Sequence, residues 1–418
     1  MNPIGDRSLA MQQPGMAMPD VAHFMRPGAL QFAALPPLSL YVHLPWCLRK
    51  CPYCDFNSHG LTEAGLTTAQ EQAYLQALRD DLDASLPLIW GRTVHSIFVG
   101  GGTPSVFSPD AIAQLLSDIR ARLRLSGDCE ITLEANPGTF ETDRFAAFAQ
   151  AGVTRLSIGV QTFNDDLLQR IGRVHSGQQA RLAAEEAARC FDTFNLDVMY
   201  ALPGQTLAML KTDLQTALAF EPPHVSVYHL TLEPNTVFAT RPPSELPDDD
   251  TAYDMLDTIT GFTAQAGLQR YEVSAYAQPG HECWHNVNYW SYGDYLGIGA
   301  GAHSKLTFAH RVVRQVRLRE PALYMRQAAA GRALASSDEV KREDLAFEFM
   351  MNALRLRQGF DRAWMTERTG LPASAFEAAL KQAESRGLIS CDWQRVVPTE
   401  RGFDFLSDLQ ATFLPESS

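Results

Sequence analysis

The stretch Tyr41-Val-His-Leu-Pro-Trp-Cys47-Leu-Arg-Lys-Cys51-Pro-Tyr-Cys54 starts inside an apolar segment, residues 38–44, and ends on three closely spaced cysteines. The apolar segment predicts a buried strand, so the cysteines are expected in the loop after its carboxyl end. Three thiolates spaced C-x3-C-x2-C can converge from one loop and hold a four-iron cluster, with one iron left open. An open iron can bind and activate a small molecule.

A structural zinc site is the alternative for the same cysteines, with His43 or His59 as a further ligand. Zinc sites usually combine two ligand pairs separated by a longer loop. Here all three sulfurs lie within eight residues, and no second pair appears in the sequence. The spacing therefore favours iron–sulfur over zinc. The other four cysteines are scattered, which does not fit a secreted disulfide framework and indicates a reducing cytoplasm.

The length of 418 residues allows two or three domains, and the composition is that of a globular protein. Its 35 lysines and arginines face 48 aspartates and glutamates, and a net charge of −13 argues against a large basic surface for nucleic acid. No apolar run is long enough to predict a transmembrane helix. Residues 1–37 hold acidic residues and prolines but no continuous apolar core, so we predict a disordered leader and no signal peptide.

Short apolar segments alternate with helical patterns along residues 38–278, which predicts repeated β/α units. The expected fold class is α/β, with a partial (β/α)6 TIM-like barrel whose site lies at the carboxyl ends of the strands. The predicted strands are residues 38–44, 96–99, 130–135, 155–160, 196–202, 225–232 and 271–276.

The chain changes character after a connecting segment, residues 279–335. Residues 336–418 predict helices at 343–356 and 374–386, a hairpin from 388–392 and 395–397, and a last helix capped by Thr399. This order is typical of a winged-helix-like domain. No helix in it carries a basic stripe, so we expect a structural or partner-docking role in place of DNA binding.

Polar residues and glycines follow several predicted strands. Phe98-Val-Gly-Gly-Gly-Thr-Pro-Ser105 can bring backbone close to a ligand. It is not a dinucleotide fingerprint, because Ser105 replaces the third glycine, and it has no lysine for a Walker loop. Glu134, Gln161 and Asp197 lie in or beside three successive apolar strands, which makes them candidates for one shared site.

The cysteine motif, with Tyr53 before its last cysteine, resembles the radical S-adenosylmethionine (SAM) superfamily. In that superfamily SAM chelates the open iron, and the reduced cluster cleaves the sulfonium to release a 5′-deoxyadenosyl radical. The resemblance implies a [4Fe–4S] cluster on Cys47, Cys51 and Cys54, SAM as cofactor and an electron donor for the cluster. The residues implied to contact SAM are Tyr41, Gly101, Gly102, Thr103, Glu134, Gln161, Arg173 and Asp197.

Within the superfamily, residues 38–418 resemble the branch of oxygen-independent coproporphyrinogen III dehydrogenase and the HemW-type haem chaperones. The dehydrogenase carries a further cysteine two residues beyond the third, where this chain has Phe56. The segment His285-Asn-Val-Asn-Tyr-Trp290 is similar to the H-N-x-x-Y-W pattern of the HemW group. The resemblance therefore implies haem binding and transfer to haem-accepting proteins, with oxidative decarboxylation of coproporphyrinogen III as the alternative activity.

Haem iron takes an imidazole or thiolate ligand, and its ring favours an apolar, aromatic wall. His285, beside Tyr289 and Trp290, is the first candidate, and His303 is the second. A role for His285 in holding a loop is the alternative. We expect a cytoplasmic protein without a nucleic-acid partner and with at most peripheral membrane association.

An alternating segment from Arg311 to Arg319 places Arg311, Arg317 and Arg319 on one strand face. The pattern predicts a solvated edge strand. Contact with haem propionates or with an acidic partner is the alternative for these three side chains.

Overall fold

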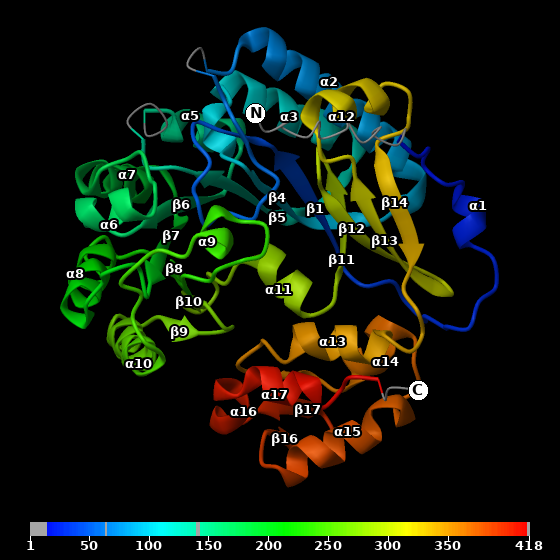
Figure 1. The fold of residues 1–418 in the computed structure, drawn as a ribbon. Helices are drawn as coiled ribbons and strands as arrows, with labels where there is room; N and C mark the ends of the chain where they lie inside the picture. The colour runs from blue at the N-terminus through cyan, green and yellow to red at the C-terminus, as the bar shows by residue number, and fades with distance from the viewer. Residues whose placement is uncertain (1–14, 63–64, 139–142, 416–418) are drawn as a thin grey trace, which may run out of the picture.

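The computed structural model describes residues 15–62, 65–138 and 143–415. A sheet of 12 strands is its largest element (Figure 1). The strand order is β14 (Leu334–Glu339), β13 (Arg311–Arg317), β12 (His303–Phe308), β11 (Asp294–Ile298), β1 (Leu38–Leu44), β4 (Thr93–Gly101), β5 (Arg124–Ala135), β6 (Arg155–Gln161), β7 (Thr193–Tyr200), β8 (His224–His229), β10 (Ala275–Ala277) and β9 (Gln269–Arg270).

The central strands, from β11 through β1 to β8, pair in parallel, and antiparallel strands extend the sheet at both ends. The expected α/β class and partial barrel are confirmed, because the parallel strands form one large sheet in which β14 and β9 are the end strands and do not pair with each other among the described residues. Strand β1 lies in the middle, with Leu40 and Val42 fully buried. Parallel strands covered on both faces are expected to be this apolar.

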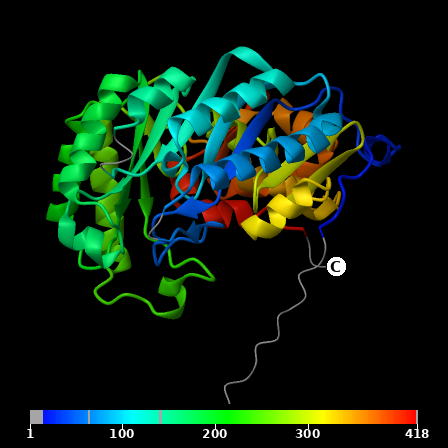
Figure 2. The ribbon, with the colours of Figure 1, turned by 90° about the horizontal axis from the view of Figure 1, so that it is seen from above.

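Helices follow most of the central strands and cover the outer side of the curved sheet in both views (Figures 1 and 2). Side-chain caps begin several of them. Thr67 and Ser176 form capping boxes, and Ser108 accepts a hydrogen bond from the nitrogen of Ala111. The helices are α2 (Thr68–Ser85), η1 (Leu86–Ile89), η2 (Pro104–Val106), α3 (Pro109–Arg122), α5 (Phe145–Ala151), α6 (Asp165–Arg170), α7 (Gly177–Cys190), α8 (Leu207–Leu218), α9 (Val237–Thr240), α10 (Asp249–Gln265) and α12 (Pro321–Ala328).

The last predicted strand of the core, residues 271–276, is wrong as a single element. The structure has a turn there between β9 and β10, which pair antiparallel. The nitrogen of Ser274 donates to the Glu272 carboxylate over 2.8 Å, and Arg270 Nη2 donates to the carbonyl of Val273 over 2.6 Å. These local bonds between side chains and backbone compete with the ladder and bend the chain.

The segment that connects the core to the tail belongs to the same sheet. Its residues form α11 (Trp284–Trp290) and strands β11, β12 and β13. The edge-strand prediction for Arg311–Arg319 is wrong, because β13, which covers Arg311–Arg317, lies between β12 and β14. Arg317 is fully buried and pairs with Asp81, and Arg311 is 7% exposed. Arg319, the third arginine of the predicted face, follows the strand and is exposed.

Part of the predicted leader is ordered. Residues 15–37 run along β12 to β14, where Met16 bridges to Leu334, and they include α1 (Val21–Phe24). Phe24 is buried and stacks on Phe308 at 4.7 Å between ring centroids. The prediction of disorder fails for these residues because burial of apolar side chains offsets the loss of chain entropy. The rest of the predicted leader, residues 1–14, lies outside the described residues.

The C-terminal elements lie below α11 in Figure 1, and their apolar core also includes Leu30, Tyr292 and Val312 from earlier in the chain. The predicted hairpin is present as β16 paired with β17, and Thr399 caps α16 by accepting from the nitrogen of Gly402. A short third strand, β15, completes this sheet. The elements are α13 (Leu345–Ala353), β15 (Phe360–Asp361), α14 (Ala363–Thr369), α15 (Ser374–Ser385), β16 (Ile389–Cys391), β17 (Arg395–Pro398), α16 (Glu400–Asp404) and α17 (Leu406–Ala411). Within the described ranges, no helix combines the length and the apolar character needed to span a membrane.

Candidate iron–sulfur and ligand cavities

The cysteine loop leaves the carboxyl end of β1 and folds back onto it. Strand β2 (Trp46–Cys47) pairs in parallel with β3 (His59–Gly60), which closes the base of the loop. The nitrogen of Cys54 donates to the carbonyl of Cys51 over 3.2 Å, so a tight turn separates these two cysteines. The position of the loop thus follows from the position of the central strand.

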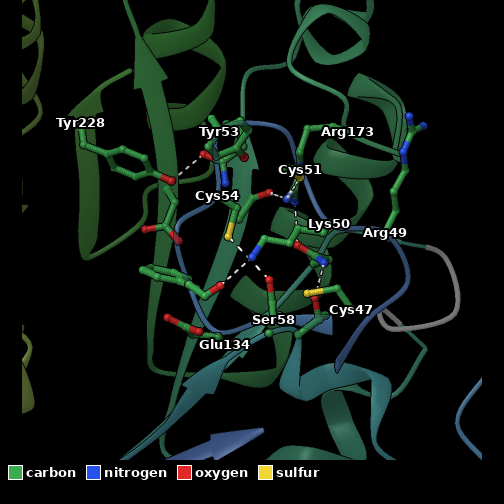
Figure 3. A pocket seen from close by; sticks show the side chains of 18 residues that line it. Cys47, Arg49, Lys50, Cys51, Tyr53, Cys54, Ser58, Glu134, Arg173 and Tyr228 are labelled. Carbon is green, nitrogen blue, oxygen red and sulfur yellow. Dashed lines mark hydrogen bonds between the residues drawn. The ribbon is translucent and has the colours of Figure 1, made fainter. Parts of the chain in front are cut away.

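All three cysteines line one cavity of about 130 Å³, which Figure 3 shows from close by. Burial raises the pKa of the Cys47 and Cys54 thiols, and Cys47 is the more deeply buried. A donor set of three sulfurs from one short loop fits an iron–sulfur cluster. Neither His43 nor His59 lines this cavity. Among the described residues, no group of three or more histidines, cysteines and acidic residues is placed to hold a single metal ion such as zinc.

Six of the eight residues expected at SAM line the cysteine cavity. They are Gly102, Thr103, Glu134, Gln161, Arg173 and Asp197. Tyr41 and Gly101 line a second cavity, which shares Glu134 with the first. Residues from β4, β5, β6 and β7 therefore meet at one edge of the sheet, as parallel strands allow.

The glycine segment after β4 approaches the cysteine loop closely. The nitrogen of Gly102 donates to the carbonyl of Leu44, and the nitrogen of Thr103 donates to the carbonyl of Trp46, each over 2.8 Å. A Cβ on Gly102 would lie 2.6 Å from that Trp46 oxygen. Gly101 has a φ of +114°, which an L side chain rarely adopts. Both glycines are therefore required by the backbone path.

Arg173 brings a positive charge to the cysteine loop. Its Nη1 lies 3.7 Å from the Cys51 sulfur, and its Nη2 donates to Asn136 Oδ1 and to the carbonyl of Gly159, each over 2.6 Å. Asn136 in turn donates to Thr103 Oγ1 over 2.9 Å. Sequence reasoning missed Asn136, although it follows β5 directly, where polar residues are informative.

Gln161 has a φ of +70°, a strained value for a residue other than glycine. Its Oε1 accepts a hydrogen bond of 2.7 Å from the Tyr228 hydroxyl, which holds the side chain at the cavity. Sequence reasoning also missed Tyr228. It lies within β8, and an aromatic residue in a strand is usually a packing residue.

Two half-buried carboxyl groups, Glu134 and Asp197, face the cysteine cavity. Burial raises the pKa of Asp197, while Asn195 and other donors lower it. Asn195 Nδ2 donates to Asp197 over 2.7 Å. Burial raises the pKa of Glu134 to about 7, against the lowering effect of a 3.0 Å hydrogen bond from the nitrogen of Gly101. This pair is suited to a cationic ligand, because a nearby positive charge would favour both ionised forms.

We expect the stability of the apoprotein to fall with rising pH through Glu134. Its pKa rises on folding from 4.5 to about 7, so the protonated form stabilises the fold below pH 4.5, and this contribution is lost as the pH passes 7. Glu134→Gln removes the titration. The unfolding free energy of this variant, relative to wild type, should rise by about 3 kcal/mol between roughly pH 4.5 and 8 in urea titrations. Glu185→Gln, on the exposed face of α7, should leave the wild-type pH profile unchanged, and a Glu134→Gln profile parallel to wild type would contradict the assignment.

The second cavity has a volume of about 700 Å³ and lies next to the first. Aromatic side chains from β1, β4, α11 and β11 form much of its wall: Tyr41, Phe98, His285, Tyr289 and Tyr295. His303, the other haem candidate, also lines it. Phe56, at the position of the absent cysteine, is 55% exposed and lines both cavities.

Burial lowers the pKa of His285 to about 3, so its imidazole is neutral at physiological pH. The ring lies 5.0 Å from the ring of Phe98 and 6.2 Å from that of Tyr41, between centroids. Its Nδ1 is 3.4 Å from the hydroxyl of Ser96, which is a long contact. The other ring nitrogen, Nε2, has no hydrogen-bond partner among the described residues. Burial first, and then nearby arginines, also lower the pKa of His303. Two neutral imidazoles therefore face one cavity.

Trp290, the last residue of the H-N-x-x-Y-W pattern, lies elsewhere. It lines a third cavity of about 540 Å³, which Glu134 and Phe56 also reach. The guanidinium of Arg355, from the C-terminal elements, lies over the Trp290 ring at 4.1 Å. The residues of the pattern therefore line two neighbouring cavities, with His285 and Tyr289 at the second and Trp290 at the third.

The cysteine loop at the end of β1, the glycine segment after β4 and the curved parallel sheet define the class of protein. Residues 41–217 match the radical SAM superfamily, and residues 340–405 match the HemN C-terminal domain. A solved structure titled coproporphyrinogen III oxidase (HemN) from Escherichia coli, a radical SAM enzyme, aligns with a TM-score of 0.76. The alignment covers 95% of this chain and 99% of that one at 23% identity, which establishes the fold.

Curated relatives place the chain more narrowly. The protein named heme chaperone HemW from Escherichia coli is 46% identical over 386 residues, which cover 91% of this chain and 99% of the relative. That of Bacillus subtilis is 33% identical over 385 residues, with 90% and 99% covered. The chain belongs to the HemW family within the radical SAM superfamily.

Proposed function

We propose that this protein is a haem chaperone, which binds haem in the 700 Å³ cavity beside a [4Fe–4S] cluster with SAM and transfers the haem to acceptor proteins. The observation that carries the proposal is the position of this cavity. It has an aromatic wall and two neutral histidines, and it adjoins the cavity of the three cysteines. The names of the curated relatives support the same function.

The cluster would be held by Cys47, Cys51 and Cys54, and when bound it supplies an electron to the sulfonium of SAM. The chain's own residues would shape the surroundings. Arg173 sets positive charge beside Cys51, and Glu134 with Asp197 offers paired carboxyls to a cationic ligand. An electron donor would be a further partner, and we place the protein in the cytoplasm.

Haem would take its axial ligand from His285, with His303 as the second candidate. A neutral imidazole is the form that binds iron, and the low pKa of His285 keeps it neutral without competition from protons. The aromatic wall would cover one face of the porphyrin. Phe56 replaces the further cysteine of the dehydrogenase branch, so we expect no conversion of coproporphyrinogen III to protoporphyrinogen IX.

The test of this function is a titration with ferric haem. Wild type should give a sharp Soret band that remains with the protein through gel filtration. His285→Ala should shift that band and weaken binding at least tenfold, because an imidazole ligand to iron is lost. His95→Ala changes an exposed histidine on β4 and should bind as wild type does. An unchanged spectrum in His285→Ala would reject the ligand role, and rapid anaerobic turnover of coproporphyrinogen III would favour the dehydrogenase.

A further inference from the structure

The second cavity, proposed above to bind haem and hereafter called the haem cavity, is also lined by arginines. These arginines belong neither to the cysteine motif nor to the H-N-x-x-Y-W pattern. Four arginines lie on or just after β13, and only Arg314 and Arg319 line this cavity. Arg317 is committed to the buried Asp81, and Arg311 donates to the carbonyl of Arg26 over 2.8 Å. Arg311 and Arg317 therefore make structural contacts, whereas Arg314 and Arg319 face the cavity.

Arg314 is held in place from the C-terminal domain. Its Nε and Nη2 donate to Glu348 of α13 over 3.3 and 2.7 Å, and its Nη1 donates to the Tyr295 hydroxyl over 3.3 Å. The Tyr292 hydroxyl also donates to Glu348, over 2.8 Å. A guanidinium has five N–H donors. The contacts in the described part of the chain use three of them, so two remain for a ligand in the cavity that Arg314 lines.

Arg319 is the more exposed of the two, and its Nε lies 3.5 Å from Asn57 Oδ1. Both arginines line this cavity together with His303. Burial first, and then these two charges, lower the pKa of that histidine. The acidic residues of the cavity, Asp55 and Glu134, also line the third cavity, which neither arginine reaches. The cavity thus has an aromatic wall, an acidic side and a cationic side.

We propose that Arg314 and Arg319 form a carboxylate-binding subsite, which receives the propionate groups of haem held in this cavity. The subsite rests on the proposed function, since it presumes a porphyrin as ligand. Arg314 is suited to it because a fixed guanidinium pairs with a carboxylate through two parallel hydrogen bonds. Glu348 acts as a positioning residue, and through it the C-terminal domain contributes to haem binding.

The experiment compares ferric haem with ferric haem dimethyl ester, whose propionates carry no charge, on the full-length protein. Wild type should bind ferric haem at least tenfold more tightly than the ester, since a hydrogen bond to a charged group contributes at least this much. Arg314→Gln and Arg319→Gln should each lose most of this preference while binding the ester within about twofold of wild type. Arg326→Gln, an exposed arginine on α12 outside the cavity, should keep the full preference.

The outcomes separate the subsite from the proposed function. Equal affinity of wild type for the two porphyrins would overturn the subsite and leave haem binding standing. Failure to bind either porphyrin would overturn both. SAM affinity should be unchanged in Arg314→Gln, and its loss would assign this arginine to the carboxylate of SAM and overturn the proposal. Glu348→Gln should reduce the preference for ferric haem by a smaller factor, without the loss of ester binding that a misfolded variant would show.

Discussion

Replacement of Cys51 by alanine is expected to abolish the iron–sulfur cluster. Anaerobically reconstituted wild type should carry about four irons per chain and a broad visible absorbance, and Cys51→Ala should carry close to none. The reason is geometric: the three thiolates come from one loop that lines one cavity, and the described residues of that cavity include no other thiol or imidazole. Cys47→Ala and Cys54→Ala should behave alike.

The control for this result is a cysteine far from the cavity. Cys391 lies on β16 in the C-terminal domain and contacts Arg362, so Cys391→Ala removes a thiol without touching the site. It should keep the iron content of wild type. Full iron in Cys51→Ala, or stoichiometric zinc without iron in wild type, would contradict the cluster assignment and favour the zinc scaffold.

The residues of the site could be predicted where they lie close together in the sequence or on successive parallel strands. Cys47, Cys51 and Cys54 lie in one loop, and Glu134, Gln161 and Asp197 lie on successive strands whose carboxyl ends must meet. Parallel pairing converts the order of these strands in the chain into neighbours in space. A single sequence therefore suffices to predict this part of the site.

Contacts between distant segments could not be predicted in this way. The place of Asn136 at the site is evident only from its hydrogen bonds to Arg173 and Thr103, which lie far from it in the sequence. The segment after Arg311 alternates as an edge strand would, but residues 334–339 pair with it and bury it. Periodicity reports the faces of a strand and carries no information about which strand comes to lie beside it.

Arg317 shows the consequence of that burial most clearly. Its side chain and that of Asp81 are both 0% exposed, with Arg317 Nε 3.3 Å from Asp81 Oδ1. Arg317 also donates to Ser304 and Ser85, each over 2.9 Å. The carboxylate of Asp81 further accepts from the nitrogen of Gly299 over 3.3 Å, so the pair holds the backbone two residues before Gly301, which lines the second cavity.

We expect Arg317→Met to destabilise the protein by about 3–5 kcal/mol, measured by urea unfolding, because a buried carboxylate loses its partner. Arg122→Met is the matched control. Arg122 also bonds an aspartate, Asp83, over 2.7 Å, but those side chains are 23% and 49% exposed, and the expected cost is about 1 kcal/mol or less. Equal effects of the two variants would contradict the prediction.

A second substitution separates the lost charge from lost packing. In Arg317→Met the penalty comes mainly from the unpaired charge of Asp81, so adding Asp81→Leu should recover much of the stability despite removing a further polar side chain. The hydroxyl of Tyr324, which donates to Asp81 over 2.9 Å, then keeps only the carbonyl of Ala77 at 3.5 Å as a described acceptor, which limits the recovery. Because Asp81 and Arg317 line neither the cysteine cavity nor the second cavity, the double variant should still assemble its cluster. A double variant less stable than Arg317→Met would indicate that packing, and not charge, dominates at this position.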